Sequence, residues 1–241
     1  MGTGIDPQIL CAWLSARSIA RELPAPIPEL GGYRVETNSQ IEVRRWVFAQ
    51  INSDLAKLAV SITSPHHFLK VCGAVEDLAA VLPTGWQLGP PSFFMRGGGA
   101  HAERPIAAGY TIQAKRNGVV SNVCILAPSG ELAASGYAAE TGEAFVYDRI
   151  VTAPEHRRKG LGRAVMCRLQ RSKSLDVPEF LVATEQGCAL YATLGWETIA
   201  PYSSASLVEP WPPLTQDITA KLTCRQPIQP GLGLFGFAHS L

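Results

Sequence analysis

A cationic stretch with two glycines, just past the middle of the chain, has the residue types to bind an anionic ligand. It reads PEHRRKGLGRAVM, and its key residues are Arg157, Arg158, Lys159, Gly160, Gly162 and Arg163. Glycine permits backbone conformations and close approaches that a Cβ would block. The free amides at a helix start, with the positive end of the helix dipole, attract anions. If a helix begins at these glycines, the stretch can hold a phosphate group, and the cations can add charge-assisted contacts.

Two other uses of the stretch have to be weighed. A basic helix start can simply be solvated, or it can contact a nucleic acid. The chain carries 21 basic and 20 acidic side chains, whereas nucleic-acid binders usually have a basic excess. We therefore expect no nucleic-acid partner. The stretch also has neither the GxxxxGK[ST] of a P-loop nor the GxGxxG of a dinucleotide site.

The surrounding pattern predicts the elements that position this stretch. Strand-like runs joined by short turns precede it, at 109–115, 119–127, 131–138 and 143–152. Such turns favour antiparallel hairpins. A helical pattern follows at 164–173, then a strand at 178–184, a helix at 187–194 and a last strand at 196–204. The stretch thus links a strand to a helix.

This order resembles that of the GNAT superfamily of N-acetyltransferases. In that family a [QR]-x-x-G-x-[GA] loop follows the fourth strand, and a helix like A-x-x-LY-x-x-LGF follows the fifth. Here RRKGLG occupies 157–162, and ALYATLGW occupies 189–196. The resemblance covers about residues 107–205. It implies a mixed α/β fold, with a mostly antiparallel twisted sheet flanked by helices.

The resemblance also implies that an acyl-CoA is the donor, with acetyl-CoA as the first candidate. Backbone amides of the loop would bind its pyrophosphate, at Arg158, Lys159, Gly160, Leu161, Gly162 and Arg163. Arg157 would shape the loop. The pantetheine arm would lie along the end of the fourth strand, at Ile150, Val151 and Thr152. One amide there would polarise the thioester carbonyl.

Acyl transfer to an amine needs a base for the amine and a proton donor for the leaving thiolate. Tyr191 stands at the family's general-acid position, four residues before Gly195. Asp148 is the candidate base, because strand alternation would put it on the face of Ile150 and Thr152. The second choices are Glu140 and Glu143. His101 and His156 are loop histidines, and His156 is better suited to tune the loop than to catalyse.

The chain departs from the family pattern in three ways. Thr184 replaces a common Asn, and Gly187 replaces the leading Ala of the second motif. Between Gly99 and Gly118 there is no room for the two helices that usually build the acceptor pocket. The sequence therefore predicts that a mainly helical N-terminal region, 1–90, supplies the pocket wall or forms a degenerate second GNAT-like half. The acetyltransferase domain would span 91–215, and an irregular tail 216–241.

The N-terminal region itself has three predictable parts. Asp6 and Pro7 have the residue types of a helix start, and apolar residues at helical spacing follow up to about residue 23. GYRVET at 32–37 reads as a strand, and Ser39 with Glu42 has the spacing of a capping box that opens a helix. Residues 53–82 are mostly helical in pattern, with a break near Pro65. A boundary or hinge is expected at 85–105.

Composition narrows the class of protein. The six cysteines show no paired spacing, so neither a metal site nor a disulfide framework is predicted. No signal peptide or membrane span is recognisable, and we expect a reduced, cytoplasmic protein. The predicted function is an acetyl-CoA-dependent N-acetyltransferase acting on a small-molecule amine or a peptide or protein amine. The alternative is a CoA-binding regulatory module without turnover, and a homodimer is left open.

Overall fold

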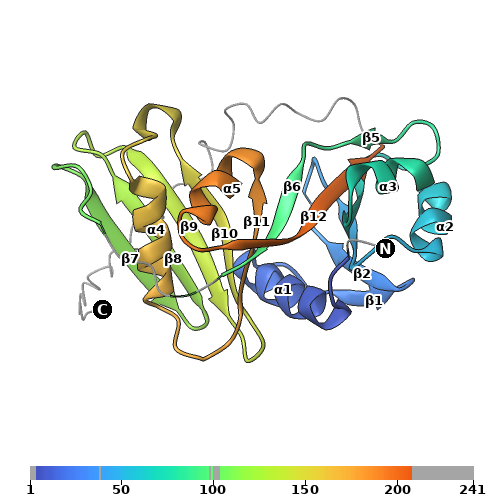
Figure 1. The fold of residues 1–241 in the computed structure, drawn as a ribbon, viewed down its shortest axis with the longest axis horizontal. Coiled ribbons are helices and arrows are strands. Elements are labelled where there is room, and N and C mark those ends of the chain that lie inside the picture. The colour runs from blue at the N-terminus through green and yellow to red at the C-terminus, as the bar shows by residue number, and fades with distance from the viewer. Residues whose placement is uncertain (1–3, 38, 98, 100–103, 208–241) are drawn as a thin grey trace, which may run out of the picture.

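The protein is built around one large mixed sheet with helices on both faces (Figure 1). The computed structural model describes residues 4–37, 39–97, 99 and 104–207. Its twelve strands follow the order β1-β2-β3-β4-β12-β6-β11-β10-β9-β8-β7, and β5 pairs with β12. Most neighbours are antiparallel, but β3 with β4 and β10 with β11 are parallel. The fold class predicted from the sequence is confirmed, whereas the predicted tail at 216–241 and His101 lie outside the described residues.

The N-terminal half contains α1 (Pro7–Ala20), β1 (Ile27–Glu29), β2 (Gly32–Glu36), β3 (Arg44–Phe48), α2 (Ser53–Ser61), β4 (His67–Cys72), α3 (Val75–Val81), β5 (Gln87–Leu88) and β6 (Ser92–Arg96). The start of α1 is as predicted, because the Asp6 side chain accepts from the amide of Gln8 at 2.7 Å. The strand predicted at 32–37 is β2. Three helices are present, but they alternate with strands.

Two predictions for this half are wrong. The helix expected to start at Ser39 is absent: the Ser39 hydroxyl accepts from the amide of Glu42 at 3.0 Å, but the pair closes a turn. The following residues form β3, whose bulky Trp46, Val47 and Phe48 are buried between two neighbouring strands. The run 53–82 breaks near Pro65 as expected, but β4 then separates α2 from α3. Burial between neighbouring strands overrides local helical spacing here.

The C-terminal half contains β7 (Thr111–Asn117), β8 (Val120–Leu126), β9 (Leu132–Glu140), β10 (Phe145–Thr152), the 3-10 turn η1 (Pro154–His156), α4 (Leu161–Gln170), β11 (Glu179–Thr184), α5 (Glu185–Ala192) and β12 (Glu197–Ser206). β7 to β10 form an antiparallel meander. Every strand and helix predicted between 109 and 204 is confirmed in kind. The phosphate-loop candidate links β10 to α4, as predicted.

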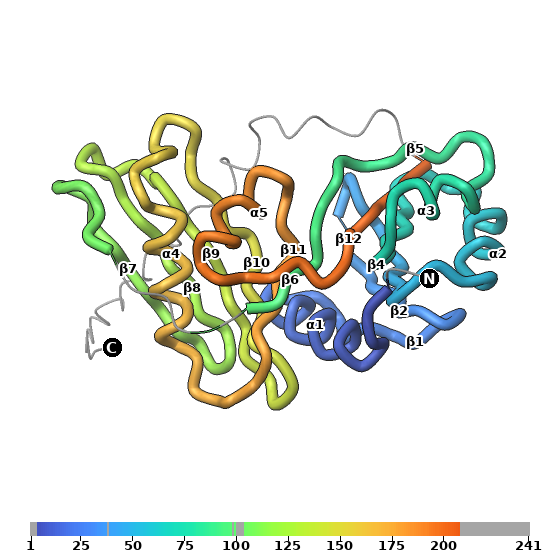
Figure 2. Tube along the Cα trace, viewed as in Figure 1, coloured from blue at the N-terminus to red at the C-terminus, as the bar shows by residue number. Residues whose placement is uncertain are grey.

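The two halves repeat one connection and exchange a strand. In each, a strand leads through a helix to a parallel strand and then through a second helix: β3–α2–β4–α3 and β10–α4–β11–α5. The last strand of each half pairs with the other half, because β6 adds to β11 and β12 adds to β4. β6 and β12 run side by side between them (Figure 2). The expected hinge at 85–105 therefore includes a central strand of the sheet, and the halves share one sheet.

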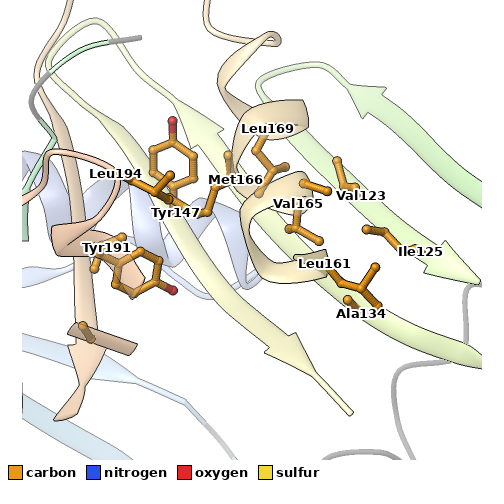
Figure 3. Close-up of a cluster of buried hydrophobic side chains, with 14 of the residues drawn as sticks. Val123, Ile125, Ala134, Tyr147, Leu161, Val165, Met166, Leu169, Tyr191 and Leu194 are labelled. Atoms are coloured by element: carbon orange, nitrogen blue, oxygen red, sulfur yellow. The ribbon is translucent and has the colours of Figure 1, made fainter. Parts of the chain in front are cut away.

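The apolar core lies in three clusters. Under α4 and α5, Leu161, Val165 and Leu169 of α4 pack on the sheet, and Tyr147 and Tyr191 belong to the same cluster (Figure 3). On the opposite face α1 buries Leu10, Trp13 and Leu14 against the sheet. The third cluster lies under α2 and α3. β10 takes part in two clusters, with Phe145 and Tyr147 toward α4 and Val146 toward α1, as strand alternation requires.

Candidate acyl-CoA site

A gap opens between β10 and β11. The two parallel strands pair only at Phe145–Glu179 and Val146–Phe180, after which β11 continues against β6. β10 keeps its other partner, β9, through a bulge between Asp148 and Val151. Within the bulge Arg149 has a φ of 53°. From Tyr147 onward, the edge of β10 that faces β11 has no strand partner, so its backbone groups can bind an extended ligand.

The equivalent position in the N-terminal half is closed. β3 and β4 pair along five residues, from Arg44–His67 to Phe48–Val71. The crossover helix α2 is capped by Asn52, whose side chain accepts from the amide of Leu55 at 2.8 Å. Among the described residues, the crossover from β3 to β4 therefore has neither a gap between its strands nor an uncapped start of its helix α2.

The start of α4 is an uncapped helix N-terminus reached through a left-handed turn. Arg158 and Gly160 have φ values of 62° and 77°. Gly160 is the N-cap, no side chain caps the helix, and its first turn holds no acidic residue. The first amides of a helix have no partner within the helix. With the dipole they give this loop the features of an anion site, and phosphate binding there stays a prediction.

Gly162 brings three elements together beside that site. A Cβ at this position would lie 3.1 Å from Leu190 Cδ2 of α5 and 3.6 Å from Thr152 Oγ1 of β10. The side chain of Leu161 is buried, so its part in ligand binding would be that of its amide. The glycine thus keeps the first turn of α4 close to the end of β10. The predicted cofactor residues of β10 and of the loop are brought together at this point.

Basic side chains surround the loop. Arg157, Arg158 and Lys159 are exposed, and Arg163 is half-buried. Arg157 Nε lies 3.4 Å from the carbonyl oxygen of Thr152, a long hydrogen bond that ties the loop to β10. This exposed positive charge suits a pyrophosphate.

Sequence reasoning missed a polar network beneath the loop. The buried ring of His156 meets the Tyr110 hydroxyl at 2.8 Å through Nδ1 and Glu131 Oε1 at 3.1 Å through Nε2. Lys159 Nζ donates to the same Tyr110 hydroxyl at 3.1 Å. His156 therefore anchors the loop to the β7–β9 region, which fits its predicted tuning role. Nothing in the sequence pattern marks Tyr110 or Glu131, since the contacts cross 46 and 25 positions.

Tyr191 lies on α5 in the cluster under α4 and α5 (Figure 3). Its ring is 6.1 Å from that of Trp196. Burial raises the pKa of its phenol, so the hydroxyl stays protonated at neutral pH. Among the described residues no hydrogen bond to this hydroxyl is found, in contrast to Tyr147, whose hydroxyl donates to Glu179 at 2.7 Å. The group can therefore donate a proton or hydrogen bond to a ligand.

Asp148 lies on the other face of the sheet. Arg21 of α1 donates to both carboxylate oxygens at 2.7 and 2.9 Å, and Arg17 and Arg149 approach to 3.5 and 3.2 Å. Burial alone would raise the pKa of Asp148, but the charges of Arg17 and Arg21 and the hydrogen bonds from Arg21 hold it below its ordinary value.

The expected alternation from Asp148 to Ile150 and Thr152 is wrong. The bulge at Arg149 shifts the register of β10, so that Ile150 packs toward α4 and Asp148 faces α1. The structure therefore does not bring Asp148 and Tyr191 together. Among the second-choice bases, Glu140 is buried and bound by Arg116 and by Ser174 and Leu175, whereas Glu143 is exposed.

Solved structures of acetyltransferases share this architecture. A GCN5-related N-acetyltransferase from Kribbella flavida superposes with a TM-score of 0.59 at 14% identity, over 84% of this chain and 95% of that chain. A protein of Novosphingobium aromaticivorans assigned to the GNAT family gives 0.52 at 15% identity, over 84% and 97%. A GCN5-related N-acetyltransferase-like protein from Streptococcus suis gives 0.51 at 13% identity, over 73% and 83%. The chain therefore has the fold of the GCN5-related N-acetyltransferases.

No protein-family model matches the chain, and no curated protein matches it. Within the described part of the chain, no helix is long and apolar enough to cross a membrane, and no group of His, Cys, Asp or Glu side chains could hold a metal ion. The five described cysteines form no disulfide with one another.

Proposed function

We propose that this chain is an N-acetyltransferase that moves the acetyl group of acetyl-CoA to a primary amine. The observation that carries the proposal is the gap between β10 and β11 beside the uncapped start of α4. A ligand with a pyrophosphate and an extended amide-containing arm fits such a pair of features. The fold supports the same reaction class, and a cytoplasmic location stays a prediction from the sequence.

The chain's residues fit the donor in two places. The amides from Arg158 to Arg163 would hold the pyrophosphate, because the N-cap of α4 makes no side-chain hydrogen bond. The unpaired edge of β10 at Ile150, Val151 and Thr152 would bind the pantetheine arm. Gly162 fits this role, because a side chain there would press on Leu190 beside Thr152. Bound acetyl-CoA supplies the activated acetyl thioester.

The roles in proton transfer are assigned from the surroundings of Tyr191 on α5 and of Asp148 on β10. Tyr191 would act as the acid, since its buried phenol keeps its proton until the thiolate leaves. Asp148 is ionised, as a base must be, but its lowered pKa makes it a poor proton acceptor near neutral pH. Its two oxygens are already bound by Arg21. We therefore propose that Asp148 positions α1, and that water takes the proton of the amine.

A calorimetric titration of acetyl-CoA into the protein tests the donor site. The informative variant is Gly162→Glu, which adds bulk and negative charge at the start of α4. The matched control is Gly142→Glu, at an exposed turn where an added Cβ meets nothing within 4 Å. We expect the first substitution to weaken binding at least about tenfold, or 1.4 kcal/mol, and the second to leave it unchanged.

The outcomes separate cleanly. Loss of affinity in Gly162→Glu alone supports the pyrophosphate site and justifies an amine screen that follows thiol release. Equal loss in both variants would point to a general charge effect. If the unmodified protein binds neither acetyl-CoA nor longer acyl-CoAs, the proposed function fails.

A further inference from the structure

A cluster of buried charges lies on the α1 face of the sheet, where the two halves meet. We call it the junction cluster, and it comprises Arg17, Arg21, Glu42, Arg45, Lys70, Asp148, Arg149 and Tyr202. Its members come from α1, from β3 and the turn before it, from β4, from β10 and from β12. Figure 1 shows α1 crossing this junction. The fold thus assembles the cluster from residues far apart in the sequence.

The junction cluster carries more positive than negative charge. Its five basic side chains share two carboxylates: Asp148 pairs with Arg17, Arg21 and Arg149, and Glu42 pairs with Arg45 and Lys70 at 2.7 and 3.0 Å. Glu22, at the end of α1, adds one more negative charge beside Arg149. The cations still exceed the carboxylates, and burying like charges together is costly unless an anion joins them.

Arg45 shows the shortage of acceptors most directly. The residue is 3% exposed, and neither its Nε nor its Nη1 has a hydrogen-bond partner of good geometry, although Nε lies close to Glu42. A buried guanidinium donor without an acceptor is unfavourable. Burial and the nearby charges of Arg45 and Arg17 lower the pKa of Lys70 to about 7. An anion bound here would satisfy both groups.

The cluster lies beside the proposed reaction centre. Asp148 begins the β10 bulge that lines the gap, and Arg17 joins Asp148 to the Arg45 side of the cluster. Val146 and Phe180, the last pair before the gap opens, pack in the same cluster as Trp13 of α1. An acceptor that enters the gap from the α1 face would therefore meet Arg17, which interacts electrostatically with Arg45 and Lys70.

We infer that the acceptor is a small amine bearing a carboxylate, and that Arg17, Arg45 and Lys70 bind this carboxylate. The inference rests on the proposed function and names its substrate class. Arginine and lysine bind carboxylates through charge-assisted hydrogen bonds, and Arg45 Nη1, which has no hydrogen-bond partner among the described residues, can supply such a bond. A neutral or cationic amine would leave the excess charge uncompensated.

The test compares amines that differ only in the carboxylate. The pairs are β-alanine with ethylamine, phenylalanine with phenethylamine, and glutamate with γ-aminobutyrate, and thiol release from acetyl-CoA gives kcat/KM. We expect the member with the additional carboxylate to be favoured at least about tenfold in one or more pairs. Arg45→Gln and, in case that buried change impairs folding, the more exposed Arg17→Gln should abolish this preference while the Kd of acetyl-CoA is kept. Lys57→Gln, at an exposed residue of α2, is the control.

A binding measurement covers the case in which no amine turns over. The N-acetylated members of each pair are added to the unmodified protein, and the thermal midpoint is followed. The additional carboxylate should raise the midpoint in the unmodified protein and in Lys57→Gln, but not in Arg17→Gln. If amines are acetylated and the carboxylate makes no difference in either assay, the inference is overturned and the proposed function stands. A preference for phosphoethanolamine over all carboxylates would also overturn it, whereas failure to bind acyl-CoA refutes the function itself.

Discussion

Arg21 holds both carboxylate oxygens of Asp148, with Nε 2.7 Å from Oδ2 and Nη2 2.9 Å from Oδ1. The pair spans 127 positions of the sequence and fastens α1 to β10 at the side of the gap. Since Asp148 is buried and is also approached by Arg17 and Arg149, its charge compensates several cations at once. We therefore expect that removing the charge of Asp148 changes the stability of the fold.

We therefore predict that Asp148→Asn destabilises the fold by about 3 kcal/mol, because it leaves buried guanidinium groups without a counter-charge. Urea unfolding at neutral pH measures this change. The lowered pKa gives a sign for pH as well: the stabilisation is present above the ordinary pKa of Asp and is lost as pH falls through the lower, folded value. The variant should therefore lose less stability than the unmodified protein on acidification. Unchanged stability with lost turnover would instead assign Asp148 as the base.

A second prediction concerns Tyr191→Phe. Removing the hydroxyl should lower kcat about 100-fold, in the range of a lost general acid, and leave acetyl-CoA affinity unchanged. The free energy of unfolding should change by less than about 0.5 kcal/mol, because no described residue hydrogen-bonds this hydroxyl. Steady-state kinetics, calorimetry and urea unfolding give the three values.

Tyr147→Phe is the matched control, since it makes the same chemical change in the same cluster. Its hydroxyl donates to Glu179, so this variant should lose about 1 kcal/mol of stability and keep its kcat. Equal kcat values for the two variants would remove Tyr191 from the proton-transfer step. A protein that binds acetyl-CoA but acetylates no amine would fit the regulatory module considered from the sequence.

Much of the C-terminal half could be predicted because its signals are local. The turns between 117 and 143 set hairpins, and the cationic glycine loop stands directly between a strand and a helix. Tyr191 follows from the helix motif that contains it. The bulge at Arg149 could not be predicted, because it depends on how β10 fits β9. Because of this bulge, Asp148 lies on the α1 face of the sheet and not on the face of Ile150.

The N-terminal half was harder because its contacts are distant. Trp46 and Val47 have helical spacing from Val43, yet they form a strand since β2 and β4 bury them on both sides. The exchange of β6 and β12 joins segments more than 100 positions apart, for which no local pattern exists. The junction cluster has the same origin, and only the fold assembles it.

A third prediction tests the network under the phosphate loop. Tyr110→Phe removes the oxygen that contacts both His156 and Lys159. Losing these hydrogen bonds should free the loop and weaken acetyl-CoA binding by about 1 kcal/mol, or roughly fivefold. Calorimetry gives the affinity, and Tyr33→Phe, on the distant strand β2, controls for the loss of a phenol hydroxyl. An unaltered Kd in Tyr110→Phe would mean that the loop is ordered without the network.

The fourth prediction concerns the pH dependence of stability at Lys70. Glu42 raises its pKa, but burial and the charges of Arg45 and Arg17 outweigh this and lower it from 10.5 to about 7. Between these values the unfolded chain binds a proton that the folded protein does not, so stability falls as pH drops from about 10 to 7 and levels off below 7.

Lys70→Met removes this titration. Relative to the variant, the unmodified protein should show a slope of the order of 1 kcal/mol per pH unit in that window. Urea unfolding from pH 7 to 10 measures the difference, and Lys57→Met, at an exposed lysine of α2, should keep the slope of the unmodified protein. Parallel curves for the unmodified protein and Lys70→Met would mean that Lys70 is charged throughout. The charge of Lys70 would then be balanced by Glu42. Lys70 would in that case not be available to bind the carboxylate of an acceptor.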